Sequence, residues 1–197
     1  MSKGESTKVA ILDEATRVAA RVGFEGLTIG QLADQAGMSK SGLFAHFKSK
    51  EQLQLETLDH ARARFVDRVV RPTLATDRGE KRVRALFDGW VVWASDAVGN
   101  GCPFVAAAFE LDDQPGPLRD ALVRNEVDWL ELIASVARTA VTEGDFRDEL
   151  DVDQFAYEVH GVMLAHHHAT RLLRDGRAGD RTRAAFESLV TAAQAPG

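Results

Sequence analysis

The run Ser39, Lys40 and Ser41 is the part of this sequence whose side-chain types and spacing best fit a binding chemistry. Hydroxyl and ammonium groups donate hydrogen bonds to phosphate oxygens and to the edges of bases. Gly37 lies just before the run and can supply the positive backbone φ that a sharp turn needs, and Ser39 can cap the helix that follows. We therefore predict these side chains at the start of a short helix that reads DNA.

Histidines and the one cysteine offer a second chemistry, metal binding or redox sensing. The run HGVMLAHHHATRLL places His160 and His167 seven residues apart on one helical face, with His166 and His168 turned to either side. The sequence has no HExxH motif, no glutamate followed three residues later by histidine, and Cys102 as its only thiol. We expect no metal site and no cofactor, and we assign the imidazoles to helix packing, dimer contacts or effector hydrogen bonds.

Cys102 is followed directly by a proline that suits the first position of a helix. Backbone N–H groups at such a position would favour a thiolate, which could sense electrophiles or oxidants. The simpler interpretation is a small buried residue. Sensing through Cys102 is kept as an alternative.

Helices must position all of these groups. Residues 1–71 and 118–195 contain no proline, and apolar residues recur there at three- and four-residue spacing, with no persistent period of two. The pattern predicts an all-α chain of about nine helices. Their expected ranges are 7–22, 28–36, 39–46, 49–71, 79–98, 103–112, 116–143, 152–174 and 178–194.

The starts and ends of the first helices have recognisable signals. Thr28 with Gln31, and Ser49 with Gln52, have the spacing of capping boxes, and the apolar stripe of the fourth helix stops near Pro72. These signals predict four helices before Pro72. The predicted apolar stripe of the first helix comprises Val9, Leu12, Ala15, Ala19 and Val22.

Composition and charge exclude several classes of protein. The chain has 197 residues, 45% of them hydrophobic, and a net charge of −6, which is typical of an ordinary globular protein. Residues 1–71 hold 11 basic and 9 acidic residues, whereas residues 72–197 hold 13 and 21, so only the first part could face phosphates. A single cysteine excludes a disulfide scaffold, and no signal peptide or membrane span is evident. We expect a cytoplasmic protein that does not enter membranes.

Residues 28–47 have the form of a helix-turn-helix. Two short predicted helices are joined by a turn at Gly37, and the second has a short apolar face of Leu43, Phe44 and Phe47. The helix predicted at 7–22 precedes them and can pack against both. In this arrangement the second short helix enters the major groove, and flanking N–H groups and hydroxyls hold phosphates.

The run GFEGLTIGQLADQAGMSKSGLFAHFKSKEQL resembles the N-terminal signature of the TetR family of transcriptional regulators, densely so over residues 10–55. The resemblance implies a DNA-binding domain at 1–48 and an effector-binding and dimerisation domain at 49–197, with 49–71 as the connecting helix. It also implies a homodimer that binds a near-palindromic operator. The residues that agree in register are Gly23, Thr28, Ile29, Ala33, Ala36, Gly37, Ser39, Leu43, Phe47, Lys50 and Leu53.

By the same resemblance, Thr28, His46 and Lys50 are phosphate contacts, whereas Lys40 and Ser41 read bases. Two departures from the family pattern matter: Phe44 stands where the family usually has tyrosine, which removes a phosphate-contacting hydroxyl, and the usual glycine comes one place later, as Gly42. The operator sequence therefore cannot be transferred. The complete set of predicted DNA-binding residues is Thr28, Ser39, Lys40, Ser41, Gly42, Phe44, His46 and Lys50.

The later part of the chain is rich in aromatic residues spread over several predicted helices. They form either an ordinary core or the lining of an effector pocket, which would favour a small apolar or planar ligand whose binding releases the operator. The candidate lining residues are Phe87, Trp90, Trp93, Cys102, Phe104, Phe109, Trp129, Met163 and His167.

A helical enzyme and a protein-binding module are the two alternatives to a regulator. A helical enzyme has no support, because the sequence lacks a P-loop, a G-x-S-x-G elbow and a Rossmann glycine run. A protein-binding module would use residues 28–47 for protein rather than DNA. A regulator should bind duplex DNA with a sequence preference and with an affinity that falls steeply as salt is added. We expect neither property of a helical enzyme or a protein-binding module.

Overall fold

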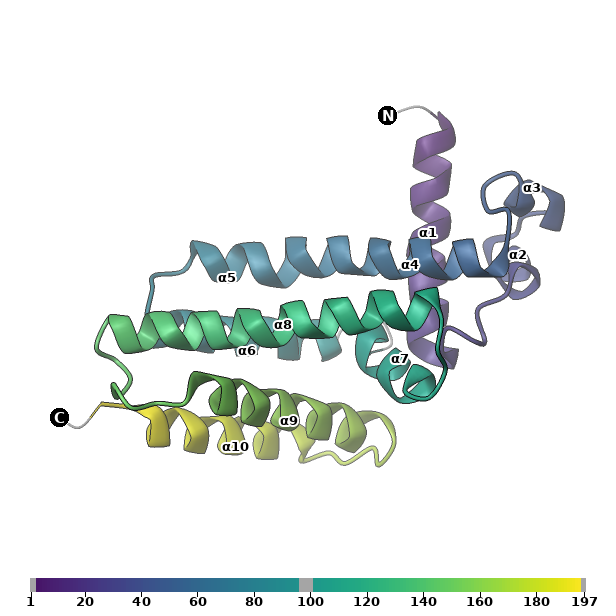
Figure 1. The fold of residues 1–197 in the computed structure, drawn as a ribbon. Helices are drawn as coiled ribbons and strands as arrows, with labels where there is room; N and C mark the ends of the chain where they lie inside the picture. Colours follow the sequence, from purple (N-terminus) through teal and green to yellow (C-terminus); the bar gives the residue numbers. More distant parts are fainter. Residues whose placement is uncertain (1–2, 96–100, 196–197) are drawn as a thin grey trace. The chain divides into compact units, whose positions relative to one another are not determined.

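Helices make up most of the described residues, 3–95 and 101–195, in the computed structural model (Figure 1). An isolated bridge between Phe146 and Gln194 is the β pairing found in those ranges. The elements in chain order are α1 (Lys3–Val22), α2 (Ile29–Ala36), α3 (Lys40–Phe44), α4 (Lys50–Phe65), a π-helical turn η1 (Val66–Val70), α5 (Arg71–Ala75), α6 (Glu80–Ser95), α7 (Pro103–Leu111), α8 (Pro117–Thr142), α9 (Val152–Arg171) and α10 (Ala178–Ala193).

The all-α prediction is confirmed, and the fourth expected helix differs in detail. It is divided into α4, η1 and α5, and it continues past its predicted end to Ala75. A proline inside an α-helix clashes with the carbonyl four residues earlier. For Pro72 that carbonyl belongs to Arg68, which lies in the wider η1 turn, so the chain stays helical through the proline. Residues 96–98 of the fifth expected helix lie outside the described ranges.

The predicted capping residues and the glycine at the end of α2 lie at helix ends in the structure. The Thr28 hydroxyl caps α2 by accepting from the Gln31 N–H at 3.2 Å. Gly37 ends α2 with a φ of +62°, a conformation that costs little only for glycine. At the start of α4, Ser49 Oγ accepts from the Gln52 N–H as predicted, whereas Gln52 Oε1 accepts from the N–H of Lys48, one residue before the cap, instead of from Ser49.

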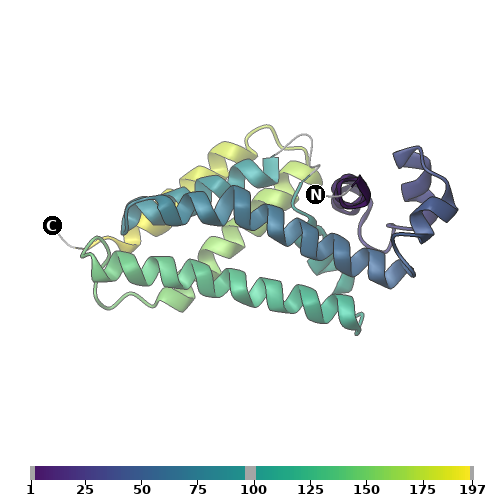
Figure 2. The ribbon, with the colours of Figure 1, turned by 90° about the horizontal axis from the view of Figure 1, so that it is seen from above.

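The buried face of α1 differs from the predicted stripe. Leu12, Ala15 and Ala19 are buried, but Val9 and Val22 are 40% and 47% exposed. The helix contacts α2, α4 and α7, so its buried side follows three neighbours rather than one face. Figure 2, where α1 is seen nearly end-on and α4 runs across the view, shows how steeply the two helices cross. The buried apolar residues of α1 are Ile11, Leu12, Ala15, Val18, Ala19 and Ala20.

The chain packs as two compact units. The first comprises Met1–Phe65 and Ser95–Asn125, and so contains α1 to α4, α7 and the start of α8. The second comprises Val66–Ala94 and Glu126–Gly197, and contains α5, α6, most of α8, α9 and α10. These units describe packing, and the expected functional boundary between residues 48 and 49 stays a prediction.

Aromatic stacking and helix pairing build the core of the second unit. The rings of Phe87 and Phe186 are parallel, with centroids 3.8 Å apart, and join α6 to α10. Phe146 and Phe155 contact at 5.5 Å near the start of α9, and α9 and α10 lie side by side (Figure 1). These contacts fix which faces of α6, α9 and α10 are interior.

Candidate nucleic-acid interface and effector region

The start of α3 presents an exposed polar surface. Ser39 Oγ accepts from the Gly42 N–H at 3.1 Å and lies 3.1 Å from Ser41 Oγ. Lys40 and Ser41 are exposed, whereas Leu43 on the opposite side is completely buried. Burial of Leu43 therefore holds this short helix in place while its first polar side chains face outward.

Thr28 and Lys40 come together at the first turn of α2. A Cβ added at Gly30 would lie 3.7 Å from Lys40 Nζ and 3.9 Å from Thr28 Oγ1. The N-terminal turn of a helix carries partial positive charge and free N–H groups. An ammonium, a hydroxyl and a helix start in one place suit an oxyanion such as a DNA phosphate.

The aromatic residues around α3 divide into a core residue and a surface residue. Phe47 is completely buried, and Lys8 Nζ lies 5.4 Å from the centre of its ring. Phe44 is 53% exposed, so its inclusion in the apolar face of this helix was wrong. The buried contacts of Leu43 and Phe47 suffice to pack the short helix, which leaves Phe44 at the surface. His46 is half-buried beside Phe47, with ring centroids 6.3 Å apart.

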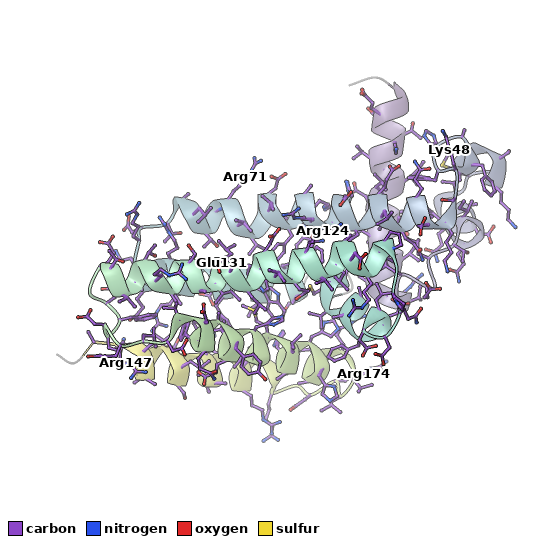
Figure 3. The ribbon with its side chains drawn as sticks, in the orientation of Figure 1. Lys48, Arg71, Arg124, Glu131, Arg147 and Arg174 are labelled. Carbon is purple, nitrogen blue, oxygen red and sulfur yellow. The ribbon has the colours of Figure 1, made fainter. Side chains whose placement is uncertain are left out.

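Two lysines flank the start of α4. Lys50 Nζ forms an ion pair with Glu25 Oε2 at 2.8 Å, and both side chains are partly exposed. Lys48 is exposed and follows α3 closely in the chain; it is labelled in Figure 3. Lys48 is not among the predicted DNA-binding residues, although the basic pair around Ser49 signals its position.

The turn between α1 and α2 is held by a residue that the sequence analysis missed. Glu110 of α7 accepts hydrogen bonds from the backbone N–H groups of Phe24 and Glu25, each at 2.7 Å. Gly23 has a φ of +82°, and a Cβ there would lie 2.5 Å from a Glu110 oxygen. On the other side, Gln54 donates to the Phe24 carbonyl at 2.6 Å. No local pattern reveals this contact, because Glu110 is 86 residues from Phe24.

An ionic cluster joins α1 to α4. Asp13 accepts from His60 Nε2 at 2.8 Å and from Arg64, and Lys8 pairs with Glu56 at 2.5 Å. Burial alone would raise the pKa of Asp13, but the hydrogen bond from His60 and the charge of Arg64 outweigh it and lower that pKa. The cluster thus holds α1 against α4 with Asp13 ionised.

The candidate effector residues lie in both packing units. In the first, Cys102 and Phe104 are 2% and 8% exposed, Phe104 contacts Phe65 at 5.8 Å, and Phe109 is 68% exposed. In the second, the Trp90 ring lies edge-on to His166, with centroids 5.9 Å apart. The other candidates in the second unit are Phe87, Trp129 and Met163, which are buried, and Trp93 and His167, which are half-buried.

Polar groups also lie inside the second unit. His160 Nε2 is 3.5 Å from Glu126 Oε2, and burial lowers the pKa of His160 while it raises the pKa of Glu126. Both shifts favour the neutral forms of a pair that would otherwise be ionic. His166 Nδ1 lies 2.9 Å from Thr182 Oγ1, and burial lowers the pKa of His166 and, as the largest cause, that of His167.

Within residues 3–95 and 101–195, no three His, Cys, Asp or Glu side chains gather as metal ligands would. None of the helices in the same ranges is both long and apolar enough to span a bilayer.

Comparisons with known proteins give a consistent result. A family model described as "Bacterial regulatory proteins, tetR family" matches residues 11–57, and one described as "Tetracyclin repressor-like, C-terminal domain" matches residues 79–186. A search of curated proteins gives no match.

Solved structures similar to this chain share its fold over nearly its whole length. A TetR transcriptional regulator from Chloroflexus aurantiacus is 27% identical, with a TM-score of 0.81 and coverage of 97% of this chain and 96% of that one. A transcriptional regulator from Saccharomonospora viridis in complex with choline is 20% identical, with a TM-score of 0.77 and coverage of 95% and 96%. AibR in complex with isovaleryl coenzyme A and operator DNA is 20% identical, with a TM-score of 0.74 and coverage of 96% and 99%.

Proposed function

Because this chain belongs to the TetR family of DNA-binding transcriptional regulators, we propose that it represses its target by binding an operator through α2 and α3 and leaves the operator when an effector binds. The observation that carries the proposal is the exposed polar start of α3, fixed from behind by buried Leu43. On this proposal the protein is a cytoplasmic regulator and has no enzymatic activity.

Each DNA-facing residue receives a role from its position. Lys40 and Ser41 reach base edges from the first turn of α3, and Thr28 holds a phosphate at the start of α2. Lys50 contacts a phosphate at the start of α4, where DNA competes with Glu25 for its ammonium group. Ser39 and Gly42 shape the start of α3, while His46 and exposed Phe44 contact the backbone and sugar edge.

A homodimer presents two such surfaces to the operator. Tyr157 and Leu172 are 71% and 70% exposed on α9 and just beyond its end, and Leu173 is 61% exposed. Large exposed apolar side chains often mark a protein interface, and we assign these to the dimer contact made by α9 and α10. Two recognition helices about 34 Å apart then fit successive major grooves of a near-palindrome.

The residues from 49 onward bind the effector and form the dimer, whereas residues 1–48 read DNA. The relatives solved with choline and with isovaleryl coenzyme A support an effector for this chain too. Its interior aromatic side chains favour a small ligand with an apolar or planar body. Burial of Cys102 to 2% exposure supports a packing role rather than a sensing role for its thiol.

Helix α7 is suited to transmit effector binding to the DNA reader. It carries the candidate effector residue Phe104 near one end and Glu110 near the other. Glu110 holds the turn before α2, and Glu25 of that turn holds Lys50. A shift of α7 on effector binding would move this turn and with it the start of α2, which lowers affinity for the operator.

The experiment begins with selection of genomic fragments by the purified protein, followed by footprinting. Lys40→Ala and Lys50→Ala are then compared with the wild type on the selected operator. We expect each substitution to weaken binding by about tenfold or more and to reduce the slope of log affinity against log salt by about 1.

Lys81→Ala is the matched control, because Lys81 is an exposed lysine of the second unit that pairs with Asp77 at the surface. It should leave operator affinity unchanged. The proposal is wrong if no duplex is preferred over random competitor DNA, or if the control weakens binding as much as the two α3 and α4 variants do.

A further inference from the structure

One buried nitrogen of the second unit lacks a hydrogen-bond partner in the part of the chain that the structure describes. His166 of α9 is 3% exposed, and its Nε2 atom makes no hydrogen bond within residues 3–95 and 101–195. A buried polar atom left in this state costs roughly 1–3 kcal/mol, so such atoms are rare and call for an explanation. A ligand that supplies the missing partner is one such explanation.

The hydrogen bonds of Thr182 determine which ring nitrogen of His166 carries the hydrogen. The Thr182 hydroxyl has one hydrogen, and it donates that hydrogen to the Ala178 carbonyl at 2.7 Å. Thr182 Oγ1 can therefore only accept from His166 Nδ1, which lies 2.9 Å away. The hydrogen of the neutral ring is on Nδ1, and Nε2 presents a bare lone pair.

The surroundings of His166 favour this neutral ring. Burial lowers the pKa of His166, so the imidazole resists a second proton near neutral pH. The Trp90 indole, 3% exposed, lies edge-on to the imidazole, with ring centroids 5.9 Å apart. The pair offers an apolar aromatic surface with one hydrogen-bond acceptor.

We propose that His166 Nε2 accepts a hydrogen bond from a hydroxyl or N–H group of the effector, and that the effector is a neutral molecule with an apolar or aromatic body and such a donor. This inference rests on the proposed function, because it assumes that the chain binds an effector. A lone pair on Nε2 repels a carboxylate or phosphate, so anionic groups do not bind there. A pure hydrocarbon leaves the acceptor unpaired and binds less tightly.

The first test needs no ligand. Long-range ¹H–¹⁵N correlation spectra of the full-length protein near neutral pH report which imidazole nitrogen is protonated. We expect His166 to carry its hydrogen on Nδ1 and to show an unprotonated Nε2. A hydrogen on Nε2 would overturn the proposal whatever the outcome of the DNA-binding experiments.

The second test uses two probes that differ by one methyl group on the phenolic oxygen: p-cresol, which donates a hydrogen bond, and its methyl ether 4-methylanisole, which cannot. We expect p-cresol to bind about tenfold more tightly in titrations followed by thermal shift and to move the ¹⁵N signal of His166 Nε2. Equal affinities, a preference for 4-methylanisole, or no binding of p-cresol at millimolar concentration would contradict the proposal.

Three variants test whether His166 causes the difference in affinity between the two probes. His166→Phe keeps an aromatic ring without the acceptor and should bind both probes equally. Should that variant not fold, Thr182→Val removes the partner of Nδ1 and should reduce the selectivity, while Thr182→Ser should retain it. Selectivity that survives both His166→Phe and Thr182→Val would contradict the assignment. Operator binding, measured separately, tells failure of this inference from failure of the proposed function.

Discussion

The turn that precedes α2 and the interior around His166 use polar groups in opposite ways. Around the turn, the backbone N–H groups of Phe24 and Glu25 are paired with Glu110, and the Phe24 carbonyl is paired with Gln54. Around His166, one ring nitrogen is paired with Thr182 and the other is buried and unpaired. Polar groups that are all hydrogen-bonded hold the backbone in one conformation. A buried polar group without a partner instead favours binding of a ligand that supplies the missing hydrogen bond.

This difference indicates that the turn before α2 is built to be rigid, whereas the interior around His166 is built to respond to a ligand. The DNA-reading helices are too short to be stable alone, so their orientation depends on buried anchors and on hydrogen bonds from distant residues. The second unit has long helices that pack through large aromatic contacts and can tolerate a polar atom held for a ligand. Three predictions test this contrast.

The largest expected effect concerns the two phenylalanines near α3. Phe47→Ala should lower the free energy of unfolding by about 3–5 kcal/mol, because a completely buried ring is lost. Phe44→Ala removes a ring that is 53% exposed, so stability should change by less than about 0.5 kcal/mol while operator affinity falls severalfold. Urea unfolding followed by circular dichroism, with operator titrations, checks both. A stability loss for Phe44→Ala equal to that of Phe47→Ala would place both rings in the core.

The next effect concerns Glu110. Glu110→Ala should lower stability by about 1–3 kcal/mol and speed hydrogen exchange at the Phe24 and Glu25 amides, because two charge-assisted hydrogen bonds to a partly exposed turn are lost. Glu131→Ala is the control, since Glu131 is 67% exposed and is paired with Arg138 at 3.6 Å (Figure 3). Unchanged exchange at both amides would show that Glu110 does not hold the turn.

The smallest effect is a difference in pH dependence between the two units. All three tryptophans lie in the second unit, so fluorescence reports on its unfolding alone. Burial lowers the pKa values of His160, His166 and His167, so below the unfolded value of about 6.5 the unfolded chain binds protons that the folded unit does not. Stability should therefore fall as pH falls from about 7.5 to 5.5, by at most about 1.4 kcal/mol per pH unit for each imidazole.

Glu126 in the second unit and Asp13 in the first also contribute to the pH dependence of stability. The raised pKa of Glu126 acts in the opposite direction, because its folded form retains a proton that the unfolded chain releases, and Glu126→Gln should steepen the fall. In the first unit the lowered pKa of Asp13 stabilises the fold above about pH 4, and this contribution is lost only as pH falls further. His166→Phe should make the fluorescence-detected pH dependence shallower. An unchanged pH dependence would mean that His166 binds a proton as readily in the folded state as in the unfolded state.

The sequence determined this protein's class, its helices and the position of its DNA reader. Those features depend on local rules: the spacing of apolar residues, the caps at Thr28 and Ser39, and the left-handed turn at Gly37, all of which act within a few residues. For the same reason the family signature is readable in the first 55 residues.

Only the tertiary structure decided which of these residues face inward and how distant ones pair. The exposure of Val9, Val22 and Phe44 depends on which helices pack against α1 and α3, and the helical passage through Pro72 depends on η1. Glu110 reaches a turn 86 residues away, and the lone pair of His166 is fixed by Thr182 on another helix. Such pairs are set by packing across the chain, which no local pattern encodes.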